Sequence, residues 1–419
     1  MWTAYYLTEI RPDLNIVILD REFAGFGASG RNGGWLSGGF SWSRQNYLDN
    51  GTQQDVARME RMLLDTVDEI IRVADNEGID ADIHRTDCLT YACSPAQMRR
   101  MYESYDEFIA AGVPESRFSV IGADDVLSKI RVNNAQGALV EHGVARIQPA
   151  KLVRGLADVV ERRGVRIFEQ TTASEISKGC VQTDRGRVTA DKIVRATEGY
   201  TSSLKGSKRE WVPLNSALVV TDPLPQSMWD DLGWDDCQLL SDSSHAYCYA
   251  QRTRDGRIAM GGRGVPYRFG SGVDVNGQTQ PETIEQLKGI LARLLPQTRE
   301  IGLHQAWCGV LGVPRDWCAT AGIDRKTGIA KAGGYVGIGV STSNMAGQTL
   351  ADLVLERTTE RTTLPWVNRK VRRWEPEPFR WLGIHSMYWL YHLADRAEAK
   401  GSSTRTSLLA RFANKITGR

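Results

Sequence analysis

The sequence predicts a fold of mixed class, α/β and α+β, in which one domain is assembled from separated segments and strand-rich stretches lie between those segments. Three observations predict this. The chain opens with a helix, a turn and a buried strand that ends on an acid, and a glycine-rich loop follows. Two strand-rich stretches then interrupt segments in which strands and helices alternate. A strand, a glycine turn and a helix return near residue 340.

The first segment has a recognisable order. Its pattern predicts a helix over residues 2–10, a turn over 11–15 and a continuous apolar strand over 16–19 that ends on Asp20. Helix, turn, buried strand and acid form the second half of a Rossmann βαβ unit. We expect the first half, a strand and a G-x-G-x-x-G turn, immediately before Met1, and the sequence as given lacks it.

The later elements follow from hydrophobic spacing and from helix stop signals. Apolar residues at three- and four-residue spacing from Val56 to Ala74 predict a long amphipathic helix that ends at Gly78. Further helices are predicted over residues 96–111, 149–163 and 341–356, and short strands over 165–197, 211–307 and 328–332. The last 50 residues are predicted to be helical.

Composition narrows the class of protein. With 419 residues, 41% hydrophobic and 24% charged, the chain is long enough for more than one domain. A net charge of +2, from 52 basic and 50 acidic residues, argues against a nucleic-acid partner. The seven cysteines form no C-x-x-C pair, which indicates a reducing compartment and no metal site. Without a targeting segment or a long apolar run, the sequence predicts a cytoplasmic protein with no transmembrane segment.

Two features at the start of the chain point to a nucleotide ligand. An acid at the end of the second Rossmann strand, here Asp20, can accept both ribose hydroxyls of an adenine nucleotide. The loop from Gly25 to Gly34 combines five glycines with the donors Ser29, Arg31 and Asn32, which suits close approach to a phosphate or a ring carbonyl. The alternatives are a helix-capping or solvent-facing acid and a flexible surface loop.

A third feature lies at residues 333–347, where the sequence predicts a strand, a glycine turn and a helix. The start of such a helix presents unpaired N–H groups and a partial positive charge. Reduced flavin carries negative charge near N1 and the C2 carbonyl, so a helix start at that position would stabilise it. The alternative is an ordinary βα turn.

These three features in this order resemble the D-amino-acid oxidase family of FAD-dependent oxidoreductases, which contains glycine, sarcosine and γ-glutamylputrescine oxidases. The Gly-Ala-Ser-Gly-Arg-Asn-Gly-Gly run at residues 27–34 is most similar to the γ-glutamylputrescine branch. The resemblance also covers residues 172–176, 196–200 and 337–339. It implies FAD as cofactor, with contacts from Asp20, Ala28, Ser29, Gly30, Arg31, Asn32, Gly33, Gly34, Ala173, Thr197, Gly337, Gly339, Ser341 and Asn344.

The resemblance implies a division of the chain. The FAD-binding domain is expected at residues 1–84, 145–205 and 308–370, and the strand-rich substrate domain at 85–144 and 206–307. Residues 371–419 form a helical C-terminal tail rich in tryptophan. We expect the tail to pack across the FAD-binding domain, and a membrane-interface or partner-binding helix is the alternative.

The resemblance also implies the reaction. An amine or amino acid gives a hydride to flavin N5, and the resulting imine hydrolyses; oxygen or another acceptor then takes the electrons. No catalytic residue is assigned. Substrate contacts are expected from His245, Tyr247, Tyr249, Arg263 and Tyr267, with core aromatics and surface cations as the alternative.

Two departures from the family pattern matter, and so does one cysteine. The sarcosine branch has a lysine below the flavin, whereas residues 257–261 hold none, so a dehydrogenase remains open. Cys308 is spaced like a cysteine that binds flavin covalently in that branch, but a buried free thiol is expected. Because the dinucleotide turn is absent, we expect FAD to bind poorly. The main alternative function is therefore a flavin-free relative that binds a ligand or partner, and a nicotinamide-dependent dehydrogenase is a weaker one.

Overall fold

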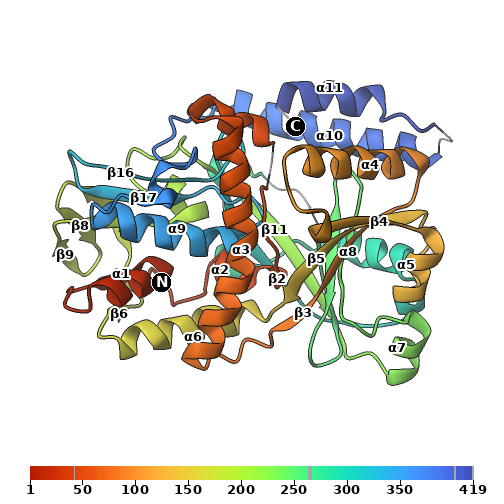
Figure 1. The fold of residues 1–419 in the computed structure, drawn as a ribbon, viewed down its shortest axis with the longest axis horizontal. Coiled ribbons are helices and arrows are strands. Elements are labelled where there is room, and N and C mark those ends of the chain that lie inside the picture. The colour runs from red at the N-terminus through yellow and green to blue at the C-terminus, as the bar shows by residue number, and fades with distance from the viewer. Residues whose placement is uncertain (42, 263–266, 401–402, 418–419) are drawn as a thin grey trace.

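The computed structural model describes residues 1–41, 43–262, 267–400 and 403–417. Two halves lie side by side, and the long helix α3 (Gln53–Glu77) runs between them (Figure 1). One half carries small sheets with helices packed on them, and the other carries a large mixed sheet. The mixed α/β and α+β class predicted from the sequence is therefore confirmed.

The first half contains two short sheets with parallel pairs and one antiparallel meander. β1 (Val17–Leu19) pairs in parallel with β6 (Arg166–Phe168). β10 (Ile193–Arg195) pairs in parallel with β17 (Ile329–Gly333), which pairs antiparallel with β16 (Thr320–Asp324). The meander consists of β7 (Ala173–Ser177), β8 (Cys180–Thr183) and β9 (Gly186–Thr189). Within the described ranges no strand joins the β1–β6 sheet to the β10–β17–β16 sheet.

Four helices of this half accompany its small sheets, and all but α2 were predicted from the sequence. They are α1 (Trp2–Ile10), α2 (Ala28–Arg31), α6 (Pro149–Arg162) and α9 (Gly339–Val354). α3 begins with a capping box between Thr52 and Asp55, and it ends at Gly78, whose φ of 69° is left-handed. α1 is apolar around most of its circumference, and it buries Trp2 and Tyr5 in one core cluster with residues of α3 and α6.

The second half is built on one sheet whose strand order is β15-β11-β14-β13-β12-β3-β5-β2, with β4 also paired to β5. The bounds are β15 (Leu303–Val313), β11 (Val212–Thr221), β14 (Ile258–Gly262), β13 (Cys248–Arg252), β12 (Leu239–Asp242), β3 (His84–Ala92), β5 (Gly137–Arg146), β2 (Trp35–Leu36) and β4 (Phe118–Gly122). Only the pairing of β12 with β3 is parallel in the described part of this sheet.

Four helices accompany this sheet, namely α4 (Pro95–Ala110), α5 (Ala123–Lys129), α7 (Gln226–Leu232) and α8 (Pro281–Leu294). The core beneath them includes the fully enclosed Tyr91, Trp229 and Trp234. Burial of such large side chains gives the sheet a rigid base, since each contributes a few kcal/mol of apolar burial, about 1.5–3 for a side chain of this class. β3 and β11, which contribute residues to this core, also contribute residues to the wall of the cavity described below.

The tail forms a hairpin of α10 (Phe379–Lys400) and α11 (Leu408–Thr417) that lies along one edge of the molecule (Figure 1). The hairpin contacts both predicted domains: Ile384 packs with Val313 and Val336 of the predicted FAD-binding domain, as expected, whereas two polar contacts reach the other domain. His385 bonds the carbonyl of Tyr267 at 2.9 Å, and Glu398 bonds His245 at 3.1 Å. These partners lie in the segments predicted as the substrate domain. Of the helices in the described ranges, none is long and apolar enough to cross a bilayer.

Candidate functional site

A cavity of about 2080 Å³ opens between the small sheets and the large sheet. Its wall includes the ends of β1 and β10, the start of α1, the glycine loop, the turn before α9, and two tyrosines from the region of β13. Segments from the start, middle and end of the chain therefore meet around one space.

Asp20 lies on this wall directly after β1, and Ala173 of β7 lies on the same cavity. The Asp20 carboxylate accepts a hydrogen bond from the Glu22 N–H at 2.9 Å. Burial raises the pKa of Asp20, because an enclosed carboxylate is poorly solvated. An acid held at a strand end by one backbone bond retains lone pairs for ribose hydroxyls.

The glycine loop contains the short helix α2, which the sequence did not predict. Ala28, Ser29, Arg31, Asn32 and Gly33 line the cavity. The Asn32 amide donates to the carbonyls of Ala28 and Ser29, at 3.2 and 3.0 Å. Its carbonyl oxygen accepts from the Gly34 N–H at 2.9 Å, so this side chain holds the loop together.

Gly30 and Gly34 were expected to contact the cofactor, but the structure does not place them on the cavity wall. A Cβ on Gly30 would lie 2.2 Å from the carbonyl oxygen of Gly25. Gly34 has a φ of 70°, and a Cβ there would lie 2.0 Å from the amide nitrogen of Gln251. Both positions need glycine because the loop packs tightly, which is a structural reason.

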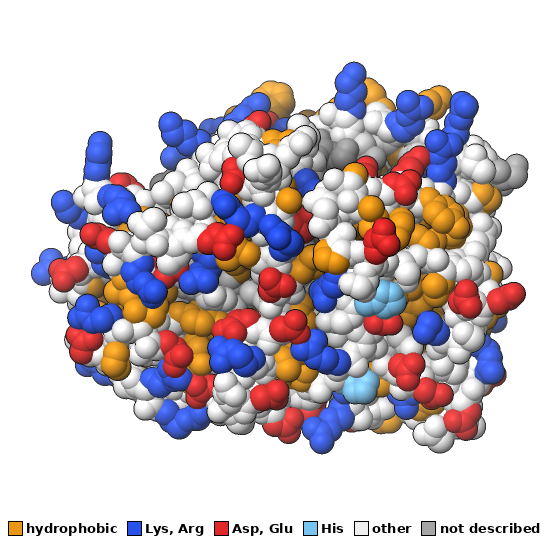
Figure 2. Space-filling view, viewed as in Figure 1, with side chains coloured by type: hydrophobic (Ala, Val, Ile, Leu, Met, Phe, Trp, Pro, Cys, Tyr) orange, Lys and Arg blue, Asp and Glu red, His pale blue; other side chains and the backbone are white. Residues whose placement is uncertain are grey.

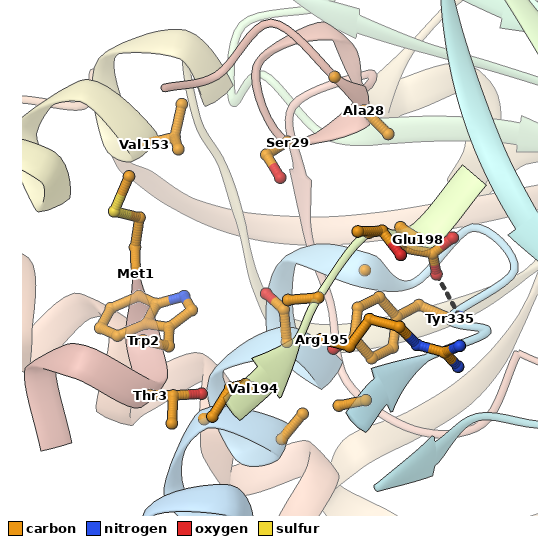
Figure 3. A pocket seen from close by; sticks show the side chains of 18 of the residues that line it. Met1, Trp2, Thr3, Ala28, Ser29, Val153, Val194, Arg195, Glu198 and Tyr335 are labelled. Atoms are coloured by element: carbon orange, nitrogen blue, oxygen red, sulfur yellow. Dashed lines mark hydrogen bonds between the residues drawn. The ribbon is translucent and has the colours of Figure 1, made fainter. Parts of the chain in front are cut away.

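The start of α1 forms another part of the wall. Figure 3 shows Met1, Trp2 and Thr3 beside the same space as Ser29 and Val153. No side chain caps this helix start. Its first backbone N–H groups therefore keep the partial positive charge that favours a phosphate group.

Glu198 is the residue that the sequence analysis missed. Its carboxylate accepts N–H bonds from Tyr335 at 3.0 Å (Figure 3), from Gly334 at 2.8 Å, and from Gly312. Burial raises its pKa to about 7, although these three N–H bonds oppose the shift. One side chain thus joins the end of β10, strand β15 and the turn before α9. The sequence offered two signals, an acid directly after a predicted strand and its place in the family-like stretch 196–200, but neither gave Glu198 a role.

The turn before α9 behaves partly as expected. Gly337, with a φ of 108°, and Gly339 line the cavity, and so does Thr197. Ser341 and Asn344 do not, because this face of α9 is packed inside the protein. The Asn344 amide donates to the Tyr6 hydroxyl at 2.9 Å, and the Ser341 hydroxyl donates to the carbonyl of Ile338. Their role is to seat α9.

Of the predicted substrate residues, Tyr247 and Tyr249 line the cavity. Tyr249 packs against Trp35 with ring centroids 5.9 Å apart. His245 lies elsewhere because β13 begins only at Cys248, so the assumed strand alternation does not reach it.

The other predicted substrate residues are not on the wall. His245 is buried and bonds Glu398 of the tail hairpin. The Tyr267 ring is fully buried, and its hydroxyl donates to Glu377. Arg263 lies outside the described residues.

Two further expectations concern cysteine and metal. Cys308 is 1% exposed and is absent from the cavity wall, and burial raises its pKa far above the usual thiol value. A thiol held neutral in this way is a poor nucleophile. In the ranges that the structure describes, no group of three or more histidine, cysteine or acidic side chains could hold a metal ion.

α9, like α1, has no side-chain cap at its start. An acid at a strand end, a glycine loop and these two helix starts around one long cavity define a protein that binds a dinucleotide cofactor. The comparison with known families makes this specific. A family model described as "FAD dependent oxidoreductase", the DAO family, matches residues 1–353. The chain belongs to this family; it is an oxidoreductase, and FAD is its cofactor.

Individual relatives agree with this assignment. The chain is 28% identical over 369 residues to γ-glutamylputrescine oxidoreductase of Escherichia coli K12, covering 84% of this chain and 80% of the relative. Glycine oxidase from Geobacillus kaustophilus superposes with a TM-score of 0.72 at 18% identity, covering 85% of this chain and 92% of the other. L-proline dehydrogenase from P. horikoshii superposes with a TM-score of 0.69 at 16% identity, covering 87% and 93%. The two solved structures establish the fold.

The residues present fit FAD. A Cβ on Gly33 would lie 2.5 Å from the Tyr249 ring, so the backbone of the loop comes close to the tyrosine end of the cavity. Asp20 and Ala173 lie on the same wall near the strand ends of the other half. FAD is elongated, with a polar nucleotide at one end and a flat ring system at the other. The cavity likewise carries an acid near the strand ends and N–H donors and an aromatic ring near the loop.

Proposed function

We propose that this protein oxidises the C–N bond of a small amine or amino acid, with a substrate of the kind that γ-glutamylputrescine oxidoreductase takes. One observation carries the proposal: Tyr247 and Tyr249 line the same cavity as the glycine loop and the turn before α9. The 28% identity to γ-glutamylputrescine oxidoreductase supports an amine over other reductants.

We assign the cofactor contacts as follows. Asp20 would accept the ribose hydroxyls, and the backbone at Ala173 would meet the adenine. Residues 28–33 and the start of α1 would hold the pyrophosphate, and the turn at Gly337 and Gly339 would face the flavin ring. When bound, FAD supplies a two-electron acceptor for the hydride of the substrate α-carbon.

The chain's own residues would position the amine. Tyr247, Tyr249 and Trp35 give an aromatic wall that excludes water and favours the neutral amine over the ammonium form. We assign no general acid or base. The strand β14 carries no lysine, so we leave open whether oxygen or another compound accepts the electrons.

We also propose the division into an FAD-binding domain of residues 1–84, 145–205 and 308–370 and a substrate domain of 85–144 and 206–307. The buried clusters support it. One cluster joins α1, α3 and α6, and a separate one fills the space beneath the large sheet.

The test is anaerobic reduction of the purified chain after incubation with FAD. γ-Glutamylputrescine, putrescine, glycine and L-proline are added in turn, and loss of the oxidised flavin absorption is recorded. Bleaching by an amine supports the proposal, and admission of air or of an artificial dye then identifies the acceptor. Bound FAD that no amine bleaches would contradict amine oxidation. A chain that binds no FAD would support the alternative, a flavin-free relative with a binding role.

A further inference from the structure

The C-terminal hairpin lies beyond residues 1–353, the part that matches the family, and it lines little of the cavity. Its inner side is packed on the protein. Ile384, Tyr391 and Ala394 of α10 are buried, as are Ala410 and Ala413 of α11. The Tyr391 hydroxyl bonds Asn414 and Thr417, both at 3.0 Å. The two helices therefore form a fixed platform on the body of the protein.

The opposite side of the hairpin is apolar. Seven of the twelve large hydrophobic side chains that are exposed in the described residues belong to it: Phe379, Leu382, Trp389, Leu408, Leu409, Phe412 and Ile416. Leu408, Phe412 and Ile416 are spaced by four residues, so they form one stripe along α11. Leu408 is 78% exposed and Phe412 is 59% exposed. A patch of exposed apolar side chains of this kind on a protein surface indicates an interaction site.

The acidic side chains of the hairpin bond to the body of the protein, whereas most of its basic side chains are exposed to solvent. Residues 379–417 contain only two acids, Asp395 and Glu398, and both bond inward. Asp395 accepts the N–H groups of His245 and Ala246, at 2.8 and 3.0 Å, and Glu398 pairs with Arg100 at 2.7 Å. The bases Arg396, Arg405, Arg411 and Lys415 are exposed. Figure 2 shows Lys and Arg side chains projecting along the upper edge, where Figure 1 places α11.

We propose that α11 docks this protein on the surface of an anionic phospholipid membrane, with the Leu408–Phe412–Ile416 stripe inserted at the level of the headgroups. Arg411 and Lys415 follow the stripe on an adjacent side of the helix, so they reach lipid phosphates while their stems cover apolar surface. Trp389 of α10 is 63% exposed, and tryptophan is favoured at a membrane interface. A helix of 10 residues is too short to span the bilayer and lies in the interface plane.

A second copy of this chain is the competing occupant of the stripe. A two-fold interface would place each cation-lined surface against an identical one. With no exposed acid in residues 379–417 to compensate, like charges would face each other, which disfavours self-association. The outward charge instead complements an anionic surface.

The experiment is co-sedimentation of the full chain with vesicles. Phosphatidylcholine vesicles that contain about 30 mol% phosphatidylglycerol are compared with pure phosphatidylcholine, at roughly 0.05 M and 0.5 M salt. We expect binding to the anionic vesicles at low salt only. The triple variant Leu408→Ser, Phe412→Ser and Ile416→Ser should lower the partition coefficient by more than roughly tenfold. Arg411→Gln and Lys415→Gln should each lower it roughly fivefold.

Matched controls carry the same changes elsewhere. Leu127→Ser and Phe168→Ser remove exposed apolar side chains from other surfaces, and Arg185→Gln with Arg187→Gln removes exposed cations. These controls should bind as the parent does. Equal binding to neutral vesicles, or full binding by the triple variant, would overturn the proposal. Absence of vesicle binding together with a dimer that the triple variant dissociates would also overturn it and assign the stripe to a second copy.

Discussion

Two glycine-rich segments face the cavity, and they are held in opposite ways. The loop at residues 25–34 depends on many separate contacts, which include the Asn32 bonds, a bond from Gln251 to the Gly33 carbonyl at 2.6 Å and one from Trp307 to the Arg31 carbonyl at 3.0 Å. The turn at residues 333–337 depends on one carboxylate, that of Glu198. The loop at residues 25–34 should therefore keep its conformation when any one of its hydrogen bonds is removed. The turn at residues 333–337 should not keep its conformation when the Glu198 carboxylate is removed.

The strongest test of this contrast is Glu198→Ala. It leaves three N–H groups inside the protein without an acceptor, so we expect the free energy of unfolding to fall by about 3 kcal/mol and FAD affinity to fall with it. Thermal unfolding and titration of flavin fluorescence measure the two effects. Glu175→Ala, at an exposed acid paired with Lys205, is the control and should change stability by less than about 0.5 kcal/mol. A stable Glu198→Ala protein would show that the turn has other support.

The next effect concerns pH. Burial raises the pKa of Glu198 to about 7, so the folded protein keeps a proton that the unfolded chain releases near pH 4.5. Its contribution to stability is therefore complete below pH 4.5 and is lost as the pH rises toward 7. We expect Glu198 to contribute a loss of about 2 kcal/mol between pH 5 and pH 7, measured as the difference between the parent and Glu198→Gln in urea unfolding.

Glu198→Gln provides the comparison for this pH dependence, because it removes the titration of Glu198 and should make the slope shallower. Part of the slope should remain, because burial also raises the pKa of Glu141 to about 7. Glu210 and Glu398 do not interfere. Burial acts to raise their pKa values, but hydrogen bonds from basic partners lower both to about 2. Their contributions are present above their ordinary pKa and disappear only as the pH falls toward 2. An equally steep loss in Glu198→Gln would assign the effect to another group.

A smaller effect is expected in the distributed loop. Asn32→Ala removes the acceptor of the Gly34 N–H and two donors, and we expect a loss of about 1 kcal/mol in unfolding free energy with a modest fall in FAD affinity. Calorimetry of FAD binding beside thermal unfolding measures both. If Asn32→Ala proves as damaging as Glu198→Ala, the contrast between the two segments is wrong.

The smallest effect is expected from Tyr249→Phe. Its hydroxyl lies 3.4 Å from that of Ser216, and the ring would remain in place. We expect FAD affinity to stay unchanged and KM for the amine to change roughly threefold, a difference of well under 1 kcal/mol. Tyr102→Phe, at an exposed tyrosine on α4, is the matched control. A fall in FAD affinity in Tyr249→Phe would place this residue with the cofactor rather than with the substrate.

Local signals predicted many of the elements, although α8 lies in a stretch that was predicted to form strands. The predicted helix over residues 2–10 coincides with α1, and Gly78 ends α3 as its position indicated. The strand at residues 16–19 and the return at 328–356 are confirmed as β1, β17 and α9. These features depend on capping, periodicity and glycine conformation, all of which are encoded within a few residues.

Residues whose role depends on distant partners were harder to predict. The role of Glu198 was not predicted because the backbone N–H groups that donate to its carboxylate lie more than a hundred residues away along the chain. His245 was misplaced because strand alternation says nothing about Glu398, which turns the ring toward the tail hairpin. Asn344 lies on a plausible helix face, but only the packing of α1 on α9 shows that this face is buried.

The way the cavity is assembled has a consequence for synthesis. β1 pairs with β6, and β10 pairs with β17. In each pair the first strand can form its hydrogen bonds only after a strand more than a hundred residues later has been translated. The turn at Gly337 is among the last parts of the wall to leave the ribosome. A nascent chain that has reached residue 300 therefore offers the adenine end of the site but not the opposite wall. FAD should be captured only after nearly the whole polypeptide has been made, and until then β10 lacks the strand with which it pairs.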